Sequence, residues 1–174
     1  MAVQAMWVHG NSAQIELTPL GRGSGEDIGQ SGVITTLGGG PVDPKRQWTA
    51  IVGYRTGAGV EYRCQDNSDY WFHFPIPTPV IDDGVRARLR RVMVLFTART
   101  AVTLSSVHVW DGPNRVFTVD GLAIGGTNTA LVDGANSFAL PDREVRWGIG
   151  VSVKFHFADP SNVVLHGAGI DFES

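Results

Sequence analysis

The 13 residues Val145-Arg146-Trp147-Gly148-Ile149-Gly150-Val151-Ser152-Val153-Lys154-Phe155-His156-Phe157 decide the fold class. Apolar side chains occupy every second position from Val145 to Phe157, and none is missing. A strand with one buried face produces this period of two, because successive side chains point to opposite sides. We therefore expect all of these apolar residues, Trp147 included, in the core. The stretch exceeds an ordinary strand of about five or six residues, so a bend at its glycines is expected.

Shorter segments with the same alternation are further strand candidates. They contain Ala13, Ile15 and Leu17; Trp48, Ala50, Val52 and Tyr54; Tyr70, Phe72, Phe74 and Ile76; and Val164, Ala168, Ile170 and Phe172. The run from Val92 to Phe96 is apolar on both faces, which is typical of a central strand. The preceding run from Val85 to Leu89 alternates in the other phase, so the sequence predicts a β-bulge at Arg90-Arg91.

Turn chemistry predicts one hairpin directly. The segment from Val102 to Trp110 ends at Asp111-Gly112-Pro113-Asn114, and Arg115 to Val119 should return antiparallel to it. Pro75, Pro77 and Pro79 argue against a central strand, because proline has no backbone N–H to donate to a neighbouring strand. That segment is expected at an edge or as an extended surface piece.

Glycine-rich stretches mark the loops, and helical patterns are missing from the sequence. Loops are expected at Gly21 to Gly32, Leu37 to Pro44 and Gly125 to Asn136, with one short strand at Val33 to Thr36. No segment of about ten residues combines helical spacing with caps. We therefore predict one domain over residues 1–174: an all-β, two-layer antiparallel β-sandwich, jelly-roll or immunoglobulin-like, with about ten strands and almost no helix.

Composition and charge argue against several partners. The net charge is −3, which provides no field for nucleic acid or an anionic membrane. The alternating run Arg86, Arg88, Arg90 and Arg91 is interpreted as a solvated strand face. Cys64 is the one cysteine, so no internal disulfide forms. The sequence has no signal peptide pattern and no membrane-spanning stretch, which favours a cytoplasmic location.

Histidines are the candidate metal ligands. His73, His108 and His156 lie out of phase with the apolar set of their strands, and on neighbouring strands they would converge on a divalent metal ion. The paired His spacing of catalytic metal barrels is missing, so a metal-dependent jelly-roll enzyme is the alternative and not the leading hypothesis. His166 shares the phase of its apolar neighbours and is expected to point inward as a hydrogen-bonded core residue.

Nucleophile and phosphate motifs are weak. Gly23-Ser24-Gly25 lacks the strand and helix of a nucleophile elbow, and Cys64 has no neighbouring His in sequence. The glycine-rich phrases lack the Lys-Ser/Thr and the helix of a phosphate loop. No catalytic residue and no cofactor are assigned, so the balance leans away from an enzyme.

Aromatic residues indicate binding. Trp7, Trp71 and Trp110 share the phase of His9, His73 and His108, respectively, each two residues away along its strand. Flat indole faces suit sugar rings or a partner subunit, which makes these three the candidate ligand-binding residues. The competing interpretation is that they form the second buried side of a strand beneath a loop.

A second candidate surface lies within residues 145–157. Gly148, Gly150 and Ser152 leave a strip without bulk, where another backbone would approach closely. Self-association into a homo-oligomer is the hypothesis attached to this strip.

Four phrases of the chain are distinctive together. They are Met6-Trp7-Val8-His9-Gly10, Trp71-Phe72-His73-Phe74-Pro75-Ile76-Pro77-Thr78-Pro79-Val80, Val107-His108-Val109-Trp110-Asp111-Gly112 and Val145-Arg146-Trp147-Gly148-Ile149-Gly150-Val151-Ser152. In this order they resemble a family of small uncharacterised bacterial all-β proteins. The resemblance implies a bacterial source and a free-standing β domain, and it brings no activity, cofactor or catalytic residue.

The leading functional hypothesis is a non-enzymatic binding or structural module that presents its Trp/His face or its loops to a ligand or to copies of itself. A metal-dependent enzyme and a carbohydrate-binding, lectin-like module are the alternatives.

Overall fold

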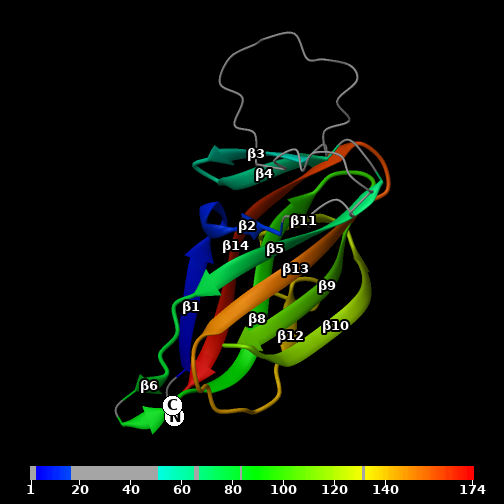
Figure 1. The fold of residues 1–174 in the computed structure, drawn as a ribbon. Coiled ribbons are helices and arrows are strands. Elements are labelled where there is room, and N and C mark those ends of the chain that lie inside the picture. Colours follow the sequence, from blue (N-terminus) through cyan, green and yellow to red (C-terminus); the bar gives the residue numbers. More distant parts are fainter. Residues whose placement is uncertain (1–2, 17–50, 65–66, 83, 131) are drawn as a thin grey trace, which may run out of the picture.

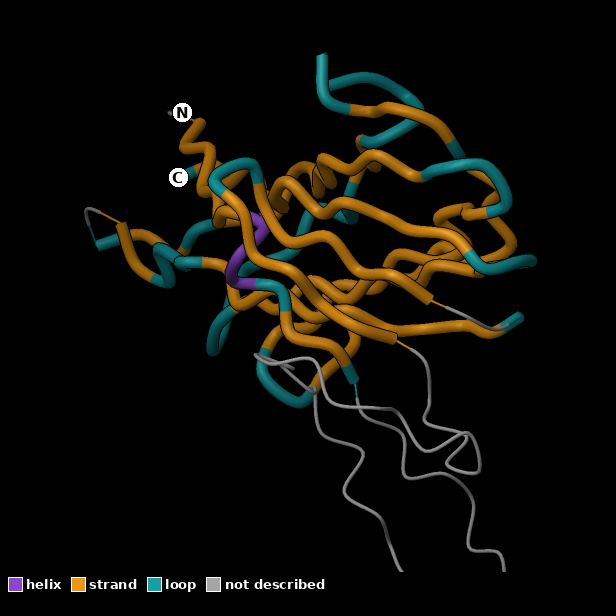
Figure 2. Tube along the Cα trace, turned by 90° about the horizontal axis from the view of Figure 1, so that it is seen from above, coloured by secondary structure: helices purple, strands orange, loops and turns teal. Residues whose placement is uncertain are grey.

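Strands make up most of the chain in the computed structural model, which describes residues 3–16, 51–64, 67–82, 84–130 and 132–174. In chain order the strands are β1 (Val3–His9), β2 (Gln14–Ile15), β3 (Ile51–Thr56), β4 (Gly59–Cys64), β5 (Ser68–Ile76), β6 (Ile81–Asp82), β7 (Val85–Arg86), β8 (Arg88–Ala98), β9 (Val102–Asp111), β10 (Asn114–Ile124), β11 (Gly126–Asn128), β12 (Ser137–Ala139), β13 (Ile149–Phe157) and β14 (Ser161–Glu173). Helical structure in these ranges is limited to η1 (Gly10–Ser12), a 3-10 turn visible in Figure 2. No helix of the described residues has the length and hydropathy needed to cross a membrane.

The long strands form two antiparallel sheets (Figure 1). Sheet A has the order β11-β8-β14-β4-β3, with β1 also paired to β14 and β12 to β8. Sheet B has the order β10-β9-β13-β5-β2. A small hairpin, β6 with β7, stands apart from both. The predicted all-β antiparallel sandwich is confirmed, and strands of two or three residues bring the number above the expected ten.

The core lies between the inward faces of the two sheets. Phe155 of β13 packs edge-on against Phe72 in its own sheet, with ring centroids 6.0 Å apart, and against Phe96 of sheet A at 5.2 Å. Large apolar side chains of both sheets are fully buried around them: Phe74, Phe157, Phe172, Leu89, Leu104, Leu165, Ile170, Val92 and Val94. Because inward and outward residues alternate, this packing leaves the other parity of every strand on an outer face.

The strand predicted over residues 145–157 is confirmed only from Ile149 onward. Val145 and Ile149 are buried as expected, but Trp147 between them is 68% exposed. The expectation that Trp147 belongs to the core is therefore wrong. Its backbone N–H donates to the buried carboxylate of Asp111, which holds residues 146–148 in a bend instead of a strand.

Three local predictions are confirmed. β9 and β10 form the expected hairpin, with Asn114 paired to Asp111. The register of β8 against β14 shifts between Arg91 and Leu89, which places a bulge at Arg90. The proline segment lies at the end of β5, beyond the residues that β2 pairs, and continues as extended chain after Ile76.

β14 contains an irregularity where two strands meet along one of its sides. β4 pairs with β14 up to Leu165, β1 pairs from Gly167 onward, and the register with β8 shifts between these two residues. His166 occupies this shift and is half-buried instead of pointing into the core. Its Nδ1 donates to the Ala58 carbonyl at 2.7 Å, and its Nε2 lies 3.1 Å from the Thr97 hydroxyl.

Some predictions fall outside the described residues. They concern Leu17, Trp48 and Ala50, the Gly23-Ser24-Gly25 phrase, the loops 21–32 and 37–44, and the short strand 33–36.

Candidate functional site

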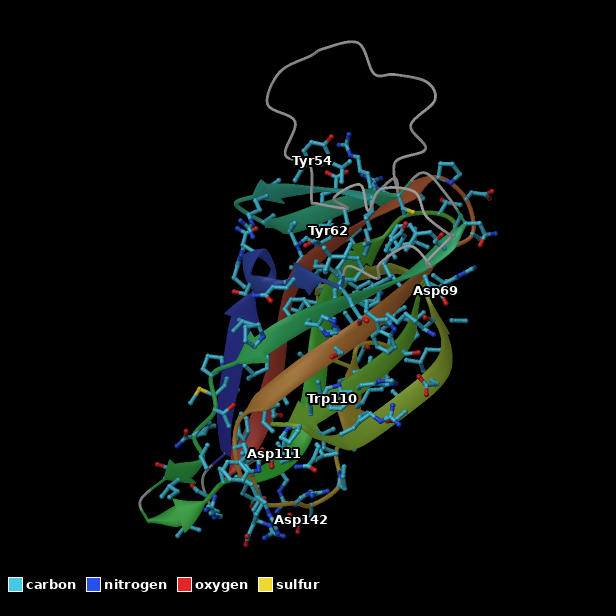
Figure 3. All side chains as sticks on the ribbon, in the orientation of Figure 1. Tyr54, Tyr62, Asp69, Trp110, Asp111 and Asp142 are labelled. Carbon is cyan, nitrogen blue, oxygen red and sulfur yellow. The ribbon has the colours of Figure 1, made fainter. Side chains whose placement is uncertain are left out.

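The outer face of sheet B presents three rows of side chains across its middle strands β9, β13 and β5. The antiparallel register aligns Trp110, Gly150 and Pro75 in the first row, His108, Ser152 and His73 in the second, and Ser106, Lys154 and Trp71 in the third. β2 extends the second row, because Gln14 pairs with His73. Figure 3 labels Trp110 beside Asp111 at one end of β9.

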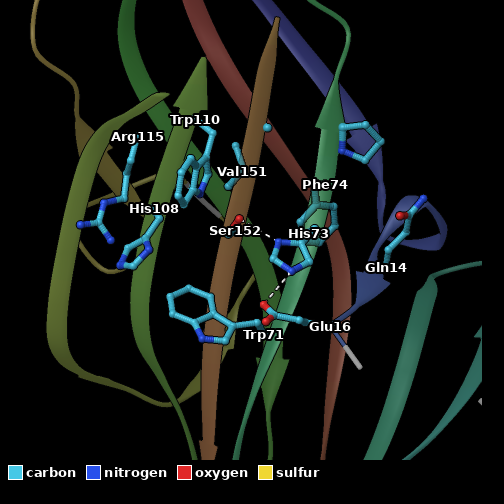
Figure 4. Close-up of a pocket in the computed structure, with 12 residues that line it drawn as sticks. Gln14, Glu16, Trp71, His73, Phe74, His108, Trp110, Arg115, Val151 and Ser152 are labelled. Carbon is cyan, nitrogen blue, oxygen red and sulfur yellow. Dashed lines mark hydrogen bonds and ion pairs between the residues drawn. The ribbon is translucent and has the colours of Figure 1, made fainter. Parts of the chain in front are cut away.

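Small residues in the central column create a cavity of about 630 Å³ on this face. Gly150 and Ser152 form its floor, and a Cβ atom placed on Gly150 would meet no other atom within 4 Å. Trp110 and His108 line the side formed by β9, and His73 lines the side formed by β5 (Figure 4). Pro75 of β5, which pairs with Gly150, lines the same side. The cavity therefore results from a glycine and a serine placed between two rows of large side chains.

Trp71 occupies the other end of the cavity. Its indole leans across the sheet onto His108, with ring centroids 4.6 Å apart and the planes tilted by 47°. The ammonium group of Lys154 lies 5.5 Å from the centre of the same indole. These contacts hold Trp71 in place and explain why His108, on an outer face, is only 8% exposed.

A chain of hydrogen bonds runs from Glu16, the residue after β2, to the cavity floor (Figure 4). His73 Nε2 lies 3.1 Å from Glu16 Oε2, and His73 Nδ1 lies 2.8 Å from Ser152 Oγ. A carboxylate only accepts hydrogen bonds, so in the neutral ring Nε2 carries the proton and donates to Glu16. Nδ1 must then accept the Ser152 hydroxyl proton, which leaves the lone pairs of Ser152 Oγ as acceptors for a ligand.

His108 has its own carboxylate partner on β10. In the neutral ring, its Nε2 donates to Asp120 Oδ1 at 2.9 Å, which leaves Nδ1 as an acceptor. The pKa of the Asp120 carboxyl lies below its usual range, because the nearby Ser106 hydroxyl and the hydrogen bond with His108 Nε2 favour its charged form. The ring N–H of His108 therefore bonds to Asp120, and the ring N–H of His73 bonds to Glu16.

The three histidines predicted as metal ligands do not converge. His73 and His108 flank Ser152 on either side, two strand spacings or about 10 Å apart. His156 lies four residues further along β13, where its Nδ1 donates to Asp69 Oδ1 at 2.8 Å. Within the described ranges, no three His, Cys, Asp or Glu side chains come close enough together to bind a metal ion.

Glu16, His73 and Ser152 have the order of a catalytic triad, but the described residues do not give Ser152 the surroundings of a nucleophile. Acyl transfer needs donors aimed at a developing oxyanion, usually backbone N–H groups close to the nucleophile. β13 lies between β9 and β5, so its backbone N–H groups near Ser152 are used in the two ladders. Ser152 is also only 6% exposed. Within the described residues, the Ser152 hydroxyl is therefore a buried hydrogen-bonding group at the cavity floor.

The three predicted tryptophans separate into two groups. Trp71 and Trp110 both line the cavity. Trp7 lies on β1 in sheet A, where its neighbours Met6 and Val8 pack inward and its indole covers Gly169 on the outside. Trp7 is therefore on the opposite face of the sandwich from the other two.

Two of the three residues of the predicted self-association strip lie at the bottom of the cavity. Gly150 and Ser152 are the cavity floor between large side chains, and Gly148 lies outside β13. β13 is a central strand with partners on both sides, so another backbone has no free edge to pair with there.

Sequence reasoning missed Gln14, Glu16, Pro75 and Arg115, which also line the cavity. Gln14 and Glu16 alternate with Ala13 and Ile15, so their outward direction was readable from the pattern. Their position beside His73 was not, because it depends on the pairing of β2 with β5.

Comparison with known proteins adds a family but no activity. No curated protein matches this chain. A family model described as a family of unknown function, DUF6623, matches residues 44–172. The match includes β3 to β13 and most of β14, and with them both cavity tryptophans, whereas the phrase at Met6 to Gly10 lies before it. The chain therefore belongs to the DUF6623 family, whose function is unknown.

Proposed function

We propose that this protein is a non-enzymatic carbohydrate-binding module and that the cavity above Gly150 and Ser152 holds one sugar ring. The observation that carries the proposal is the floor of small residues between Trp110 on one side and Pro75 on the other. β9 and β5 are two strand spacings apart, about 10 Å, which leaves a slot for a flat ring above Gly150. An indole and a pyrrolidine offer apolar surfaces for the C–H faces of such a ring.

The polar groups of the cavity match the hydroxyl groups of a sugar. Ser152 Oγ and His108 Nδ1 are acceptors, because the ring protons of His73 and His108 go to Glu16 and Asp120. A ligand rich in O–H donors satisfies these acceptors, whereas an apolar ligand would leave them buried without a partner. A few fixed polar groups among aromatic walls are the usual composition of a small-molecule site.

Substitution of the cavity floor tests the proposal without removing a contact of the fold. In the variant Gly150→Val the new side chain points into empty cavity, and the backbone there needs no positive φ. We expect this variant to keep the melting temperature of the wild type and to lose binding on a broad glycan array, together with the quenching of Trp fluorescence by the bound sugar.

Gly134→Val is the control, because a Cβ atom on Gly134 also meets nothing within 4 Å and Gly134 does not line the cavity. It should retain binding to the same glycans. Glycan binding that survives Gly150→Val, or a wild-type protein that binds no sugar on the array, would contradict the proposed site.

A further inference from the structure

Trp147 is the most exposed large apolar side chain of the described residues. It is 68% exposed, although Val145 and Ile149 on either side of it are buried. An indole left in water forgoes a large gain from burial, and exposed aromatic groups of this kind often mark binding surfaces. Its exposure therefore requires an explanation beyond the fold of β13.

The backbone holds Trp147 outside the core. Asp111, itself 2% exposed, accepts hydrogen bonds from the N–H groups of Arg146, Trp147 and Gly148 at 2.8, 2.7 and 3.1 Å. The side chain rests against Gly112, where a Cβ atom would come within 3.0 Å of it, and where φ is +56°. These contacts fix Trp147 before any ligand arrives, so binding to it costs little conformational entropy.

The cavity floor leads toward this side chain. Gly112 N–H donates to the Gly148 carbonyl at 2.9 Å, one step beyond the row that contains Trp110 and Gly150. A Cβ atom on Gly148 would meet nothing within 4 Å, as on Gly150. At the opposite end, Trp71 leans onto His108 and places a large side chain across the row beyond Ser152. A chain-like ligand held in the cavity therefore leaves it past Gly148, toward Trp147.

We infer that Trp147 is a second sugar-binding platform, which stacks on the next unit of an oligosaccharide whose terminal unit occupies the cavity. This inference rests on the proposed function and specifies its ligand class: a glycan chain bound by its end. A free monosaccharide uses the cavity alone. A longer chain of the same sugar also contacts the exposed indole.

The test compares three proteins on single sugars and on longer chains of the same sugars. The sugars are those that the wild type binds on the glycan array, and affinities are measured by titration calorimetry. Trp147→Ala removes the platform from an exposed position, so the fold is retained. Trp7→Ala is the control, because it removes an indole from the outer face of sheet A. We expect Trp147→Ala to weaken binding of the longer chains by roughly three- to tenfold and to leave single sugars unchanged.

Each outcome decides a different point. Equal affinity of Trp147→Ala and wild type for the longer chains overturns the second platform, while loss of binding in Gly150→Val still supports the cavity. An equal loss for single sugars and chains also overturns it, because Trp147 would then act on the cavity itself. A wild type that binds no glycan overturns both proposals. Acrylamide quenching of Trp fluorescence is the second readout: chains should protect the wild type more than single sugars do, and this extra protection should be lost in Trp147→Ala.

Discussion

Replacing Asp111 tests whether one buried carboxylate fixes the bend before β13. The carboxylate accepts three backbone N–H groups from residues 146–148, which no other strand pairs. Hydrogen bonds to a charged group contribute about 1.5–3 kcal/mol each. The segment is partly exposed, so its N–H groups would regain water after the substitution. We therefore expect Asp111→Ala to lower the free energy of unfolding by about 3–5 kcal/mol, below the full value of three bonds.

Asp111→Asn removes the charge of the side chain but keeps its size and shape. Its Oδ1 still accepts from Trp147 and Gly148, but an amide nitrogen would face the Arg146 N–H and cannot accept from it. The expected loss is about 1–3 kcal/mol, between wild type and alanine.

Urea unfolding measures both variants, and hydrogen exchange at the amides of residues 146–148 locates the effect. Faster exchange confined to these amides in the asparagine variant, with an unchanged m-value, supports local release of the bend. If Asp111→Ala unfolds within about 1 kcal/mol of the wild type, or if these amides exchange as before, the carboxylate does not hold the bend.

Two further predictions concern backbone crowding and pH. Gly59 has φ +137°, and a Cβ atom there would lie 2.1 Å from the Leu165 carbonyl oxygen, so Gly59→Ala should cost about 2 kcal/mol or more in chemical unfolding. Gly57→Ala, in the same turn with open space, should be neutral or slightly stabilising, and equal costs for the two would refute the crowding. The pKa of Asp120 is lowered in the folded protein, so its contribution to stability is present above the ordinary carboxyl pKa and is lost as pH falls through the lowered value. Asp120→Asn should therefore reduce the dependence of the urea midpoint on acidic pH, and an unchanged dependence would count against the pairing.

The parts of the fold that depend on local pattern were readable from the sequence. Alternation places Val151 and Phe155 in the core, and the Asp111-Gly112-Pro113-Asn114 turn predicts the β9–β10 hairpin. The change of phase before Val92 locates the bulge at Arg90. In each case the signal lies within a few residues, so no knowledge of distant partners is needed.

The sequence predicts individual residues of the site but not that they come together in one cavity. Trp71, Trp110 and Ser152 were singled out, but for separate reasons, and Trp7 was grouped with the two tryptophans although it lies in the other sheet. What assembles the cavity is the order β9-β13-β5, which pairs residues far apart in the chain. A period of two reports the side of a strand on which a residue lies, not the strand beside it.

Trp147 is a residue for which the alternation of apolar side chains gives the wrong prediction. Its phase is that of buried neighbours, and periodicity alone assigns it to the core. The deciding interaction comes from Asp111, 36 residues earlier in the chain. Polar residues in turns usually bond locally, so nothing in the sequence indicates that this one binds a distant segment.

The place of β14 has a consequence for how the molecule is made. It is the last described strand, yet it pairs with β1, β4 and β8, and Val3 of the first strand lies opposite Glu173. During synthesis, β1 stays unpaired until β14, more than 150 residues later, has been made. Such non-local pairing gives a high contact order, for which folding times of about milliseconds to seconds are typical. Until β14 arrives, β1 and β8 have exposed edges, so a slow translation or a truncated product favours aggregation.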